Sequence, residues 1–369
     1  MLDPIDALLE DDVFAAGAPD ERFTQACGFC LDVLIRRFPA YRSFLHERGC
    51  GGLPRNLSLA QVQMLPAIFL PVLKGCAFSV PNDVAITVRL TSSGTTGKPS
   101  VTPLDEPSMK RRVQAMLATY RAAGIVSGSV EALAFLIDPS QTQMAGSVVI
   151  DAALRAIPEV RSVRYLVQQT AAGLDFALRE SVAAIQAAGT RGPVLLVGYP
   201  ALMAAAMHGL ATAGVKRLPL PAGSRILTGG GWKSFLPGVP LERAEFQERM
   251  ADFFALPADA IRDMFGLSEC PAVFVQCSQG QYHAPAFAWA QAIDPETGTE
   301  VAAGDVGLLQ LTTPLTTSYP LLKILTTDKV TIMRGCSCGV AAPYLTPRGR
   351  TTAARFETCA MKIGRAVTA

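Results

Sequence analysis

The sequence predicts an α/β protein in which a parallel sheet with crossover helices is followed by a smaller β-rich part. Apolar, strand-like runs alternate with helical stretches between about residues 86 and 228, and this alternation is typical of a parallel sheet. From about Ala272 onward the strands become short and are separated by Gly and Pro turns. With 369 residues the chain can bury a large core, as one domain or as a main domain with an appendage.

Residues 1–85 are expected to be mostly helical with irregular connections. Between Phe23 and Phe38 the apolar residues recur at close to helical spacing, which predicts an amphipathic helix. Cys27 and Cys30 fall on its apolar side. Their C-x-x-C spacing also occurs in redox and metal pairs, but no second pair follows nearby, so we expect both thiols in the core.

The alternating region begins with a strand expected at Ile86 to Leu90. A helix is expected from about Pro107 to Ala123, because proline suits a first turn and Gly124 suits the end of a helix. The further strands of this region are expected at Ala132 to Ile137, Arg164 to Gln168, Val194 to Gly198 and Arg225 to Thr228. The intervening helices are expected around Ala145 to Ala156, Leu174 to Ala188 and Ala201 to Ala213. The β-rich part is expected to contain strands at Val273 to Cys277, Phe287 to Ile293, Gly307 to Thr312 and Val330 to Met333.

Composition and charge argue against several classes of protein. A net charge of +2 with evenly mixed signs does not indicate a surface that binds nucleic acid. Hydrophobic residues make up 50% of the chain, yet Gly, Pro or charged residues interrupt each apolar run before it could span a bilayer. The acidic N-terminus, Met1 to Asp6, does not have the pattern of a signal peptide, and nine cysteines without such a signal suggest reduced thiols or metal ligands. We therefore expect a cytoplasmic protein.

The most informative stretch is Thr91 to Pro99, which reads Thr-Ser-Ser-Gly-Thr-Thr-Gly-Lys-Pro and follows the first strand of the alternating region. Its two glycines allow backbone N–H groups to converge on an anion, which is typical of a phosphate-binding loop. It is not a Walker A loop, because Ser92 stands where that pattern needs glycine and Pro99 stands where it needs Ser or Thr. A polar surface loop is the simpler alternative. The candidate phosphate-binding residues are Thr91, Ser92, Ser93, Gly94, Thr95, Thr96, Gly97 and Lys98.

Later stretches suit the other parts of a nucleotide. Gly229-Gly230-Gly231-Trp232-Lys233 follows a predicted strand, and a glycine run lets the backbone lie flat against a planar base. Asp328 ends the stretch Thr326-Thr327-Asp328, and a carboxylate suits both hydroxyls of a ribose because it only accepts hydrogen bonds. Each of these signals is weak alone, so their order along the chain carries the interpretation.

Taken together, these stretches resemble the adenylate-forming superfamily, which includes acyl-CoA ligases, luciferases and peptide-synthetase adenylation domains. All nine residues of the phosphate-binding loop match, and Gly-Gly-Gly-Trp-Lys narrows the resemblance to the acyl-protein synthetase (LuxE-like) branch of bacterial bioluminescence. Met264-Phe265-Gly266-Leu267-Ser268-Glu269 resembles the aromatic-Gly-x-Thr-Glu segment, with Ser268 in place of Thr. The resemblance implies that Glu269 coordinates Mg²⁺ and that Ser268 contacts the α-phosphate of ATP. It also places Gly229, Gly230, Gly231, Trp232, Phe265, Gly266, Asp328 and Arg350 at the nucleotide, with Asp328 on the ribose and Arg350 at the start of the C-terminal segment.

The same resemblance implies a domain organisation. Residues 1–345 would form the adenylating (AMP-binding) domain, with a helical part at 1–85 and a β-rich subdomain at about 272–345. Residues 346–369 would be a truncated C-terminal segment, because the mobile domain that carries a catalytic lysine elsewhere is largely missing, as it is in the acyl-protein synthetases. Lys98, Lys233 and Lys362 are therefore the candidate cations for the adenylation step.

The implied reaction activates a carboxylic acid, fatty or aromatic, as an acyl-adenylate and then transfers the acyl group to a thiol. ATP and Mg²⁺ are the implied cofactors, and Lys98 would help the loop amides to neutralise the phosphates. The acid pocket is expected to draw on Asp138-Pro139-Ser140, on Gly198-Tyr199-Pro200 and on the residues just before Glu269. The thiol would belong to the chain itself, to a carrier or reductase protein, or to CoA.

Cys359 is the candidate acceptor within the chain. It stands where the acyl-protein synthetases place an acylated cysteine, so the resemblance implies that it takes the acyl group and presents it to a partner reductase. Arg355 and Lys362 nearby would favour its thiolate. The local match lacks a glycine where Thr358 stands, and an ordinary tail cysteine is the alternative.

Two other functions remain open at this point. An acyl-CoA or aryl-CoA ligase of the phenylacetate type has a Cys-x-Cys-Gly segment similar to Cys336 to Gly339, and pyrophosphate release that depends on CoA would favour it. A non-catalytic nucleotide-binding or carrier-docking subunit would bind ATP without acid-dependent pyrophosphate exchange. The presence of Lys98, Glu269 and Asp328 argues against this second alternative.

Four soft ligands in the β-rich part form a candidate metal site. Cys277 and His283 are spaced Cys-x₅-His, and Cys336 and Cys338 are spaced Cys-x-Cys. If the two pairs meet, they form a Cys₃His set that suits structural Zn²⁺, and some phenylacetate-ligase-like enzymes look similar here and hold zinc. Cys270 could replace Cys277, and separate buried thiols with an exposed histidine are the alternative.

Overall fold

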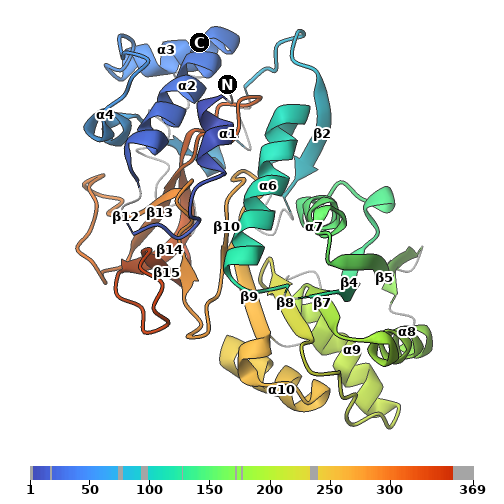
Figure 1. Cartoon of the computed structure of the whole chain (residues 1–369). Helices are drawn as coiled ribbons and strands as arrows, with labels where there is room; N and C mark the ends of the chain where they lie inside the picture. The colour runs from blue at the N-terminus through green and yellow to red at the C-terminus, as the bar shows by residue number, and fades with distance from the viewer. Residues whose placement is uncertain are drawn as a thin grey trace.

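The parallel sheet expected from the alternating pattern organises one half of the molecule (Figure 1). The protein is described by a computed structural model, which covers residues 3–16, 19–73, 78–92, 99–126, 128–170, 173–175, 178–232 and 240–351. The strands of this sheet lie in the order β10-β9-β8-β7-β4-β5-β6, and the five central ones are parallel. Their bounds are β4 (Val130–Ile137), β5 (Val160–Thr170), β6 (Gly173–Asp175), β7 (Val194–Gly198), β8 (Arg225–Gly229), β9 (Ile261–Gly266) and β10 (Val273–Val275).

Helices cover this sheet and form a first hydrophobic core with it. They are α7 (Ala145–Ala156), α8 (Leu178–Arg191), α9 (Pro200–Thr212) and α10 (Arg243–Phe254), with short 3₁₀ turns η1 (Pro139–Gln141) and η2 (Ala258–Ala260). β7 and α7 have the predicted bounds, and β4, β5, β8 and α9 lie within a few residues of theirs. β7 is entirely apolar and β4 is apolar except for Glu131, and both are buried along nearly their whole length, as central parallel strands should be.

A second sheet, almost entirely antiparallel, forms the other half of the molecule. Its order is β11-β15-β14-β13-β12, and β1 adds to β14 in parallel. The strands are β1 (Ile68–Phe69), β11 (Tyr282–His283), β12 (Trp289–Ile293), β13 (Gly307–Thr312), β14 (Lys323–Met333) and β15 (Tyr344–Arg350). The N-terminal helices pack on it and share a second core, with α1 (Pro4–Leu8), α2 (Glu21–Arg37), α3 (Pro39–Glu47), α4 (Leu59–Met64) and α5 (Leu70–Leu73). Cys27 and Cys30 are fully buried in this core, which confirms the structural interpretation of the C-x-x-C spacing.

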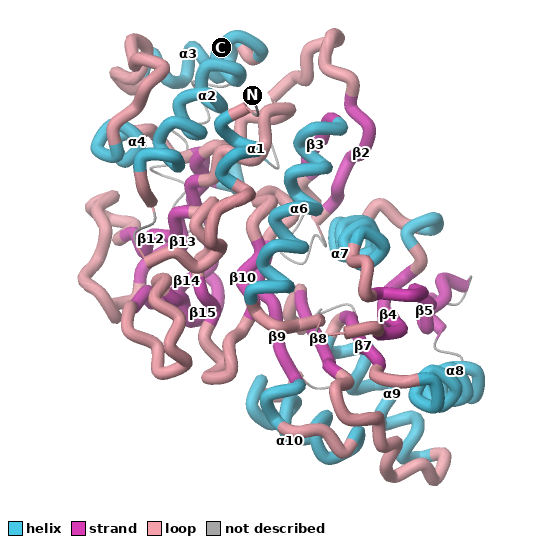
Figure 2. The backbone as a smooth tube through the Cα atoms, viewed as in Figure 1, coloured by secondary structure: helices cyan, strands magenta, loops and turns pink. Residues whose placement is uncertain are grey.

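Helix α6 (Glu106–Ala122) lies between the two halves (Figures 1 and 2). The hairpin of β2 (Ile86–Thr91) and β3 (Val101–Asp105) leads into it. Asp105 caps its first turn by accepting a hydrogen bond from the backbone N–H of Ser108. Met116 and Tyr120 of this helix pack into the first core, whereas Ala115 packs into the second. α6 is therefore placed to connect the two halves through buried side chains.

Some segments differ from the sequence-based expectation. β10 was expected in the β-rich part, but it pairs antiparallel with β9 and so extends the first sheet. A helix was expected from Leu174, but residues 173–175 form the short strand β6, and α8 begins only at Leu178. β14 begins at Lys323, seven residues before the predicted strand, because its first half pairs with both β1 and β13.

A search of the described helices finds none that combines the length and the apolar character needed to cross a bilayer.

Candidate active site

Two of the expected nucleotide segments lie where parallel strands of the first sheet end. The glycine run follows β8, and the segment that contains Glu269 follows β9, its parallel neighbour. Because the carboxyl ends of parallel strands meet at one edge of a sheet, ligands of open α/β sheets commonly bind there. Asp138 and Tyr199 follow β4 and β7 at the same edge. The fold therefore brings these two nucleotide segments and the segments of Asp138 and Tyr199 to one edge of the first sheet.

Glu269 is the best-defined residue of this site. Its side chain is buried, with 7% of the residue exposed. The hydroxyl of Ser268 donates to Oε2 at 2.8 Å, and the hydroxyl of Ser100 donates to Oε1. Among the described residues, these two donors leave about two of the roughly four acceptor positions of a carboxylate without a partner. A metal-binding carboxylate needs such acceptor positions.

Ser92 and Ser100 hold the two ends of the expected phosphate-binding loop together. The backbone N–H of Ser100 donates to Oγ of Ser92 at 2.9 Å, and the backbone N–H of Ser92 donates to the carbonyl of Ser100 at 3.0 Å. Thr91 is anchored separately, since its N–H and its hydroxyl both donate to the carbonyl of Gln143. Ser100 was not singled out in the sequence, although it is a hydroxyl residue directly after the motif. The interior of the loop, Ser93 to Lys98, lies outside the described residues.

The glycine segment adopts backbone conformations that favour glycine. Gly230 and Gly231 have φ angles of +74° and +65°. The indole N–H of Trp232 is buried and finds no hydrogen-bond partner among the described residues. Lys233, expected next to it, lies outside the described part of the chain. Backbone of this kind can approach a planar ligand closely, since no Cβ stands in the way.

A buried polar network supports the two motif strands. Asp263 on β9 accepts from the hydroxyl of Thr228 at 2.6 Å and from the hydroxyl of Tyr282 at 2.5 Å. Burial raises the pKa of Asp263, and the hydrogen bonds from Thr228 and Tyr282 oppose that shift. Sequence reasoning missed this residue, although it lies two positions before Phe265 in the recognised motif. The network ties β8 and β9 to the strand that carries His283.

The expected ribose-binding residue meets the expected arginine. Arg350 Nε donates to Oδ1 of Asp328 at 2.6 Å, and the two residues face each other in the register of β14 and β15. The backbone N–H of Asp328 donates to the hydroxyl of Thr326. The acceptor Asp328 is buried while the arginine is half exposed, so the pair lies at the surface of the second sheet.

Two of the three segments expected to line the acid pocket follow the neighbouring strands β4 and β7. Asp138 accepts from the N–H and the hydroxyl of Ser140, and these hydrogen bonds lower the pKa of its carboxyl group. Tyr199 is buried, which raises the pKa of its hydroxyl to about 12. A Cβ on Gly146 would lie 2.3 Å from the Tyr199 oxygen, so the tyrosine packs directly against the start of α7.

The four candidate metal ligands converge. One ligand atom from each of Cys277, His283, Cys336 and Cys338 lies within 4.8 Å of all the others. The sulfur atoms of Cys277 and Cys336 are 3.8 Å apart, and Nε2 of His283 is 3.2 Å from the sulfur of Cys338. His283 is 1% exposed, so the alternative of an exposed histidine is wrong. Cys270 is buried elsewhere and does not belong to the group.

The pairing of β11 with β15 explains this convergence. His283 lies opposite Tyr344 in the ladder, which brings the turn after β14 next to the turn before β11. Nδ1 of His283 lies 3.0 Å from the carbonyl oxygen of Ala342, which favours a proton on Nδ1 and leaves Nε2 free as an acceptor. Although burial opposes it, hydrogen bonds with His283 and with backbone amides lower the pKa of Cys277 to about 6. Burial and the neighbouring sulfur atoms raise the pKa of Cys338 to about 11.

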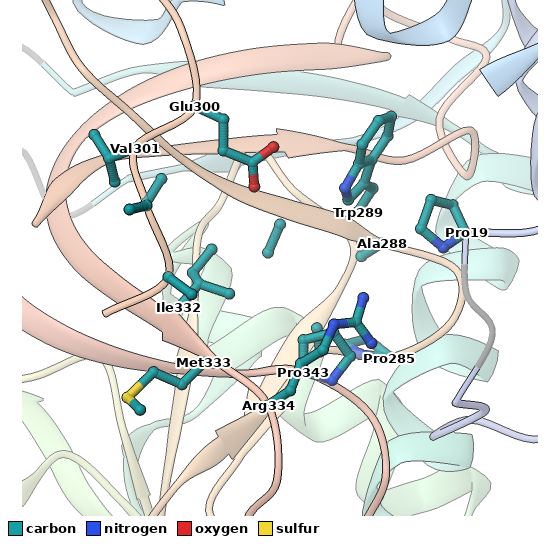
Figure 3. Close-up of a pocket in the computed structure, with 15 residues that line it drawn as sticks. Pro19, Pro285, Ala288, Trp289, Glu300, Val301, Ile332, Met333, Arg334 and Pro343 are labelled. Atoms are coloured by element: carbon teal, nitrogen blue, oxygen red, sulfur yellow. The ribbon is translucent and has the colours of Figure 1, made fainter. Parts of the chain in front are cut away.

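A separate cavity of about 240 Å³ lies on the second sheet (Figure 3). Trp289 and Pro19 stand on one side of it, and Ile332 and Met333 contribute from β14. None of the nucleotide motif residues lines it. The cavity is thus distinct from the site at the edge of the first sheet.

Cys359, Arg355 and Lys362 lie outside the described residues.

Comparisons with known proteins agree with the motifs. The model of the family "Acyl-protein synthetase, LuxE" matches residues 29–368. The long-chain-fatty-acid–luciferin-component ligases of Aliivibrio fischeri and Vibrio harveyi are 37% and 33% identical to the chain, each over 110 residues. Each of these two alignments spans 30% of this chain and 28% of the relative.

Solved structures show the same fold. A 2-hydroxyisobutyryl-CoA ligase bound to 2-HIB-AMP matches with a TM-score of 0.68 at 16% identity, over 92% of this chain and 69% of the other. A long-chain-fatty-acid-CoA ligase from Archaeoglobus fulgidus matches with a TM-score of 0.52 at 13% identity, over 75% of this chain and 54% of the other. These likenesses confirm the α/β fold of the adenylate-forming enzymes. Because the family model extends over most of the chain, the protein belongs to the acyl-protein synthetase (LuxE) family.

Proposed function

We propose that this protein activates a carboxylic acid with ATP and transfers the acyl group to a thiol. The observation that carries the proposal is the position of Glu269, a buried carboxylate held by Ser100 and Ser268 where the phosphate-binding loop closes. Membership of the acyl-protein synthetase family supports the same reaction. Since both relatives are named as long-chain-fatty-acid ligases, we propose a fatty acid in preference to an aromatic one.

The donor set at Glu269 fits Mg²⁺. This cation prefers carboxylate oxygens, phosphate oxygens and water in octahedral geometry, and Glu269 supplies a buried carboxylate with open acceptor positions. When bound, Mg²⁺ would offset the negative charge of the phosphates. In this proposal Ser92 and Ser100 hold the ends of the loop, whose amides and Lys98 would contact the phosphates. Gly229 to Trp232 and Phe265 would enclose the base, and Asp328 would accept hydrogen bonds from the ribose.

The reaction has two steps. An oxygen of the fatty acid carboxylate attacks the α-phosphorus of ATP, the bond to the β-phosphate breaks, and pyrophosphate leaves. A thiolate sulfur then attacks the acyl carbon, and AMP leaves. The role of the protein in both steps would be to position the reacting groups and to stabilise charge, which are the main sources of catalysis in such reactions. Lys98, Lys233 and Lys362 remain the candidates for the cation of the first step.

We propose Cys359 as the thiol within the chain and a reductase or carrier protein as the next acceptor. CoA would take this place if the protein is a CoA ligase. A cytoplasmic location is part of the same proposal, and it is supported by the seven described cysteines, all of which are free thiols.

The Cys/His group fits a structural Zn²⁺ ion. With Zn–S bonds of about 2.3 Å, two sulfur ligands of a tetrahedral site lie about 3.8 Å apart, and Cys277 and Cys336 have this separation. The contact between Nδ1 of His283 and the carbonyl of Ala342 would fix the ring with Nε2 toward the metal. We therefore propose that the four side chains hold one Zn²⁺, which would join the turn before β11 to the turn after β14.

The function is tested by ATP–pyrophosphate exchange over a panel of fatty and aromatic acids, with and without CoA. We expect exchange that depends on a fatty acid and does not require CoA, and that is lost in Glu269→Gln and Lys98→Ala. Wild-type rates in both variants would overturn the proposal. Pyrophosphate release that requires CoA would favour a CoA ligase, and ATP binding without exchange for any acid would favour a non-catalytic subunit.

A further inference from the structure

We propose that Arg112 is a positioning residue, which fixes the Glu269 carboxylate in the orientation needed for Mg²⁺. Arg112 lies on α6, more than 150 residues from Glu269 in the sequence, and it touches neither ATP nor the reacting atoms in this proposal. The inference rests on the proposed function, since it names a residue that prepares the same site.

The guanidinium group of Arg112 binds the backbone on both sides of Glu269. Nη1 donates to the carbonyl of Ser268 at 2.8 Å, and Nη2 donates to the carbonyls of Leu267 at 2.6 Å and Cys270 at 2.9 Å. These three carbonyls come from the residues that immediately surround Glu269. One side chain thus sets the path of the whole turn that presents the carboxylate.

Burial makes these contacts hard to replace. Arg112 is 4% exposed and Cys270 is 1% exposed, so water has little access to the donors or the acceptors. Burial lowers the pKa of Arg112 to about 10, while attraction to Cys270 and Glu269 opposes the shift. The side chain therefore stays charged at neutral pH. A buried carbonyl that loses such a donor is left unsatisfied, and this penalty would favour a different path for the turn.

The two oxygens of Glu269 depend on that path. Ser268 donates its hydroxyl to Oε2 while Arg112 holds its carbonyl, so the two contacts act on the same residue. Ser100 donates to the other oxygen from the end of the phosphate-binding loop. Mg²⁺ demands near-ideal octahedral geometry with short bonds, so a small rotation of the carboxylate should weaken its binding.

The preceding residue, Arg111, provides a matched contrast. It is 5% exposed and lies on the same helix, but it points to the N-terminal segment. Its Nε donates to Asp6 at 2.7 Å, and its Nη2 forms an ion pair with Asp3. Within the described chain, none of its hydrogen bonds or ion pairs involves residues 267–270. Two adjacent buried arginines thus contact different parts of the molecule. Comparing variants at the two positions therefore distinguishes a general loss of stability from a specific effect on the site.

The test compares Arg112→Met with Arg111→Met in the full-length protein. The first readout is the Mg²⁺ concentration that half-saturates binding of a fluorescent ATP analogue, with no acid present. The second is the same Mg²⁺ dependence for fatty-acid-dependent pyrophosphate exchange. Thermal unfolding of each variant is measured alongside. We expect at least a tenfold higher Mg²⁺ requirement in Arg112→Met and a wild-type requirement in Arg111→Met, even where both melt at lower temperature.

Arg112→Lys is a second variant, which keeps the test decisive if Arg112→Met does not fold. It keeps the charge but cannot present the planar fork, so we expect a Mg²⁺ requirement between those of the wild type and Arg112→Met. The inference is overturned if Arg112→Met, or Arg112→Lys where the methionine variant is unfolded, needs no more Mg²⁺ than the wild type. It is also overturned if the Arg111 and Arg112 variants shift equally. If no acid supports exchange in the wild type but nucleotide binding shows the expected Mg²⁺ shift, the proposed function fails and the role of Arg112 stands.

Discussion

Arg350 donates to Asp328 across two adjacent strands, with Nε 2.6 Å from Oδ1. The aspartate belongs to the stretch expected to bind ribose, and the arginine begins the segment expected to follow the adenylating domain. Their pairing shows that these two motifs, 22 residues apart, meet through the register of β14 and β15. The second oxygen of Asp328 has no hydrogen-bond partner within the described part of the chain, so it is the oxygen we expect to face a ribose hydroxyl.

Removing each member of this pair should affect ATP binding to different extents. Asp328→Ala should weaken ATP binding about 10- to 100-fold, since a hydrogen bond to a charged group contributes about 1.5–3 kcal/mol. Arg350→Ala should cost only a few-fold, because a half-exposed ion pair contributes about 1 kcal/mol or less. The dissociation constant of ATP measures both effects. Arg348→Ala, a neighbouring exposed arginine, is the control, and unchanged ATP affinity in Asp328→Ala would contradict the assignment.

Loss of the Ser100 hydroxyl should impair catalysis while the fold is retained. The hydroxyl donates to Glu269 from a buried position, so Ser100→Ala leaves one oxygen of a buried carboxylate without its donor. We expect a fall of about tenfold or more in kcat/KM for pyrophosphate exchange, in line with a charge-assisted hydrogen bond. Ser100→Thr keeps the hydroxyl and should restore most of the activity. Equal rates for the wild type and Ser100→Ala would show that Ser100 does not orient Glu269.

Much of the fold could be predicted because two of the central strands contain continuous apolar runs. β4 and β7 were recognisable from such runs, and α6 from its proline start and glycine end. β9 was not predicted as a strand, because its residues Arg262 and Asp263 break the apolar pattern. Asp263 is tolerated inside the sheet because Thr228 and Tyr282 donate to it, and partners from other strands cannot be seen in a local pattern.

The parts of the site formed by residues that are contiguous in the sequence could be predicted. The contacts between residues that are distant in the sequence could not. The motif around Glu269 could be read directly, whereas Arg112 stands in Lys-Arg-Arg on a helix and resembles a solvated charge. Its burial depends on the packing of α6 between two cores. The four Cys/His ligands could be proposed as two pairs, but only the pairing of β11 with β15 brings Cys277 close to Cys336.

Metal content should distinguish a zinc site from a group of unrelated thiols. Protein purified without chelator or affinity tag should contain about one zinc per chain. Cys336→Ser should lower both the zinc content and the melting temperature, because a structural site that loses a ligand no longer joins the two turns. Cys50→Ser, which alters a cysteine remote from the group, should keep the metal. Metal-free protein that remains fully active and melts at the same temperature would rule the site out.

The last prediction concerns the thiol that receives the acyl group. Incubation with a radiolabelled fatty acid and ATP, followed by denaturing electrophoresis, should label the wild-type chain, and hydroxylamine should remove the label because it cleaves thioesters. Cys359→Ser should stay unlabelled while its pyrophosphate exchange continues, since the first step does not use this thiol. Glu269→Gln should lose both exchange and label, which separates failure of activation from failure of transfer. Equal labelling of the wild type and Cys359→Ser would show that another residue accepts the acyl group. Label that moves only to added CoA would instead assign the second step to a CoA ligase.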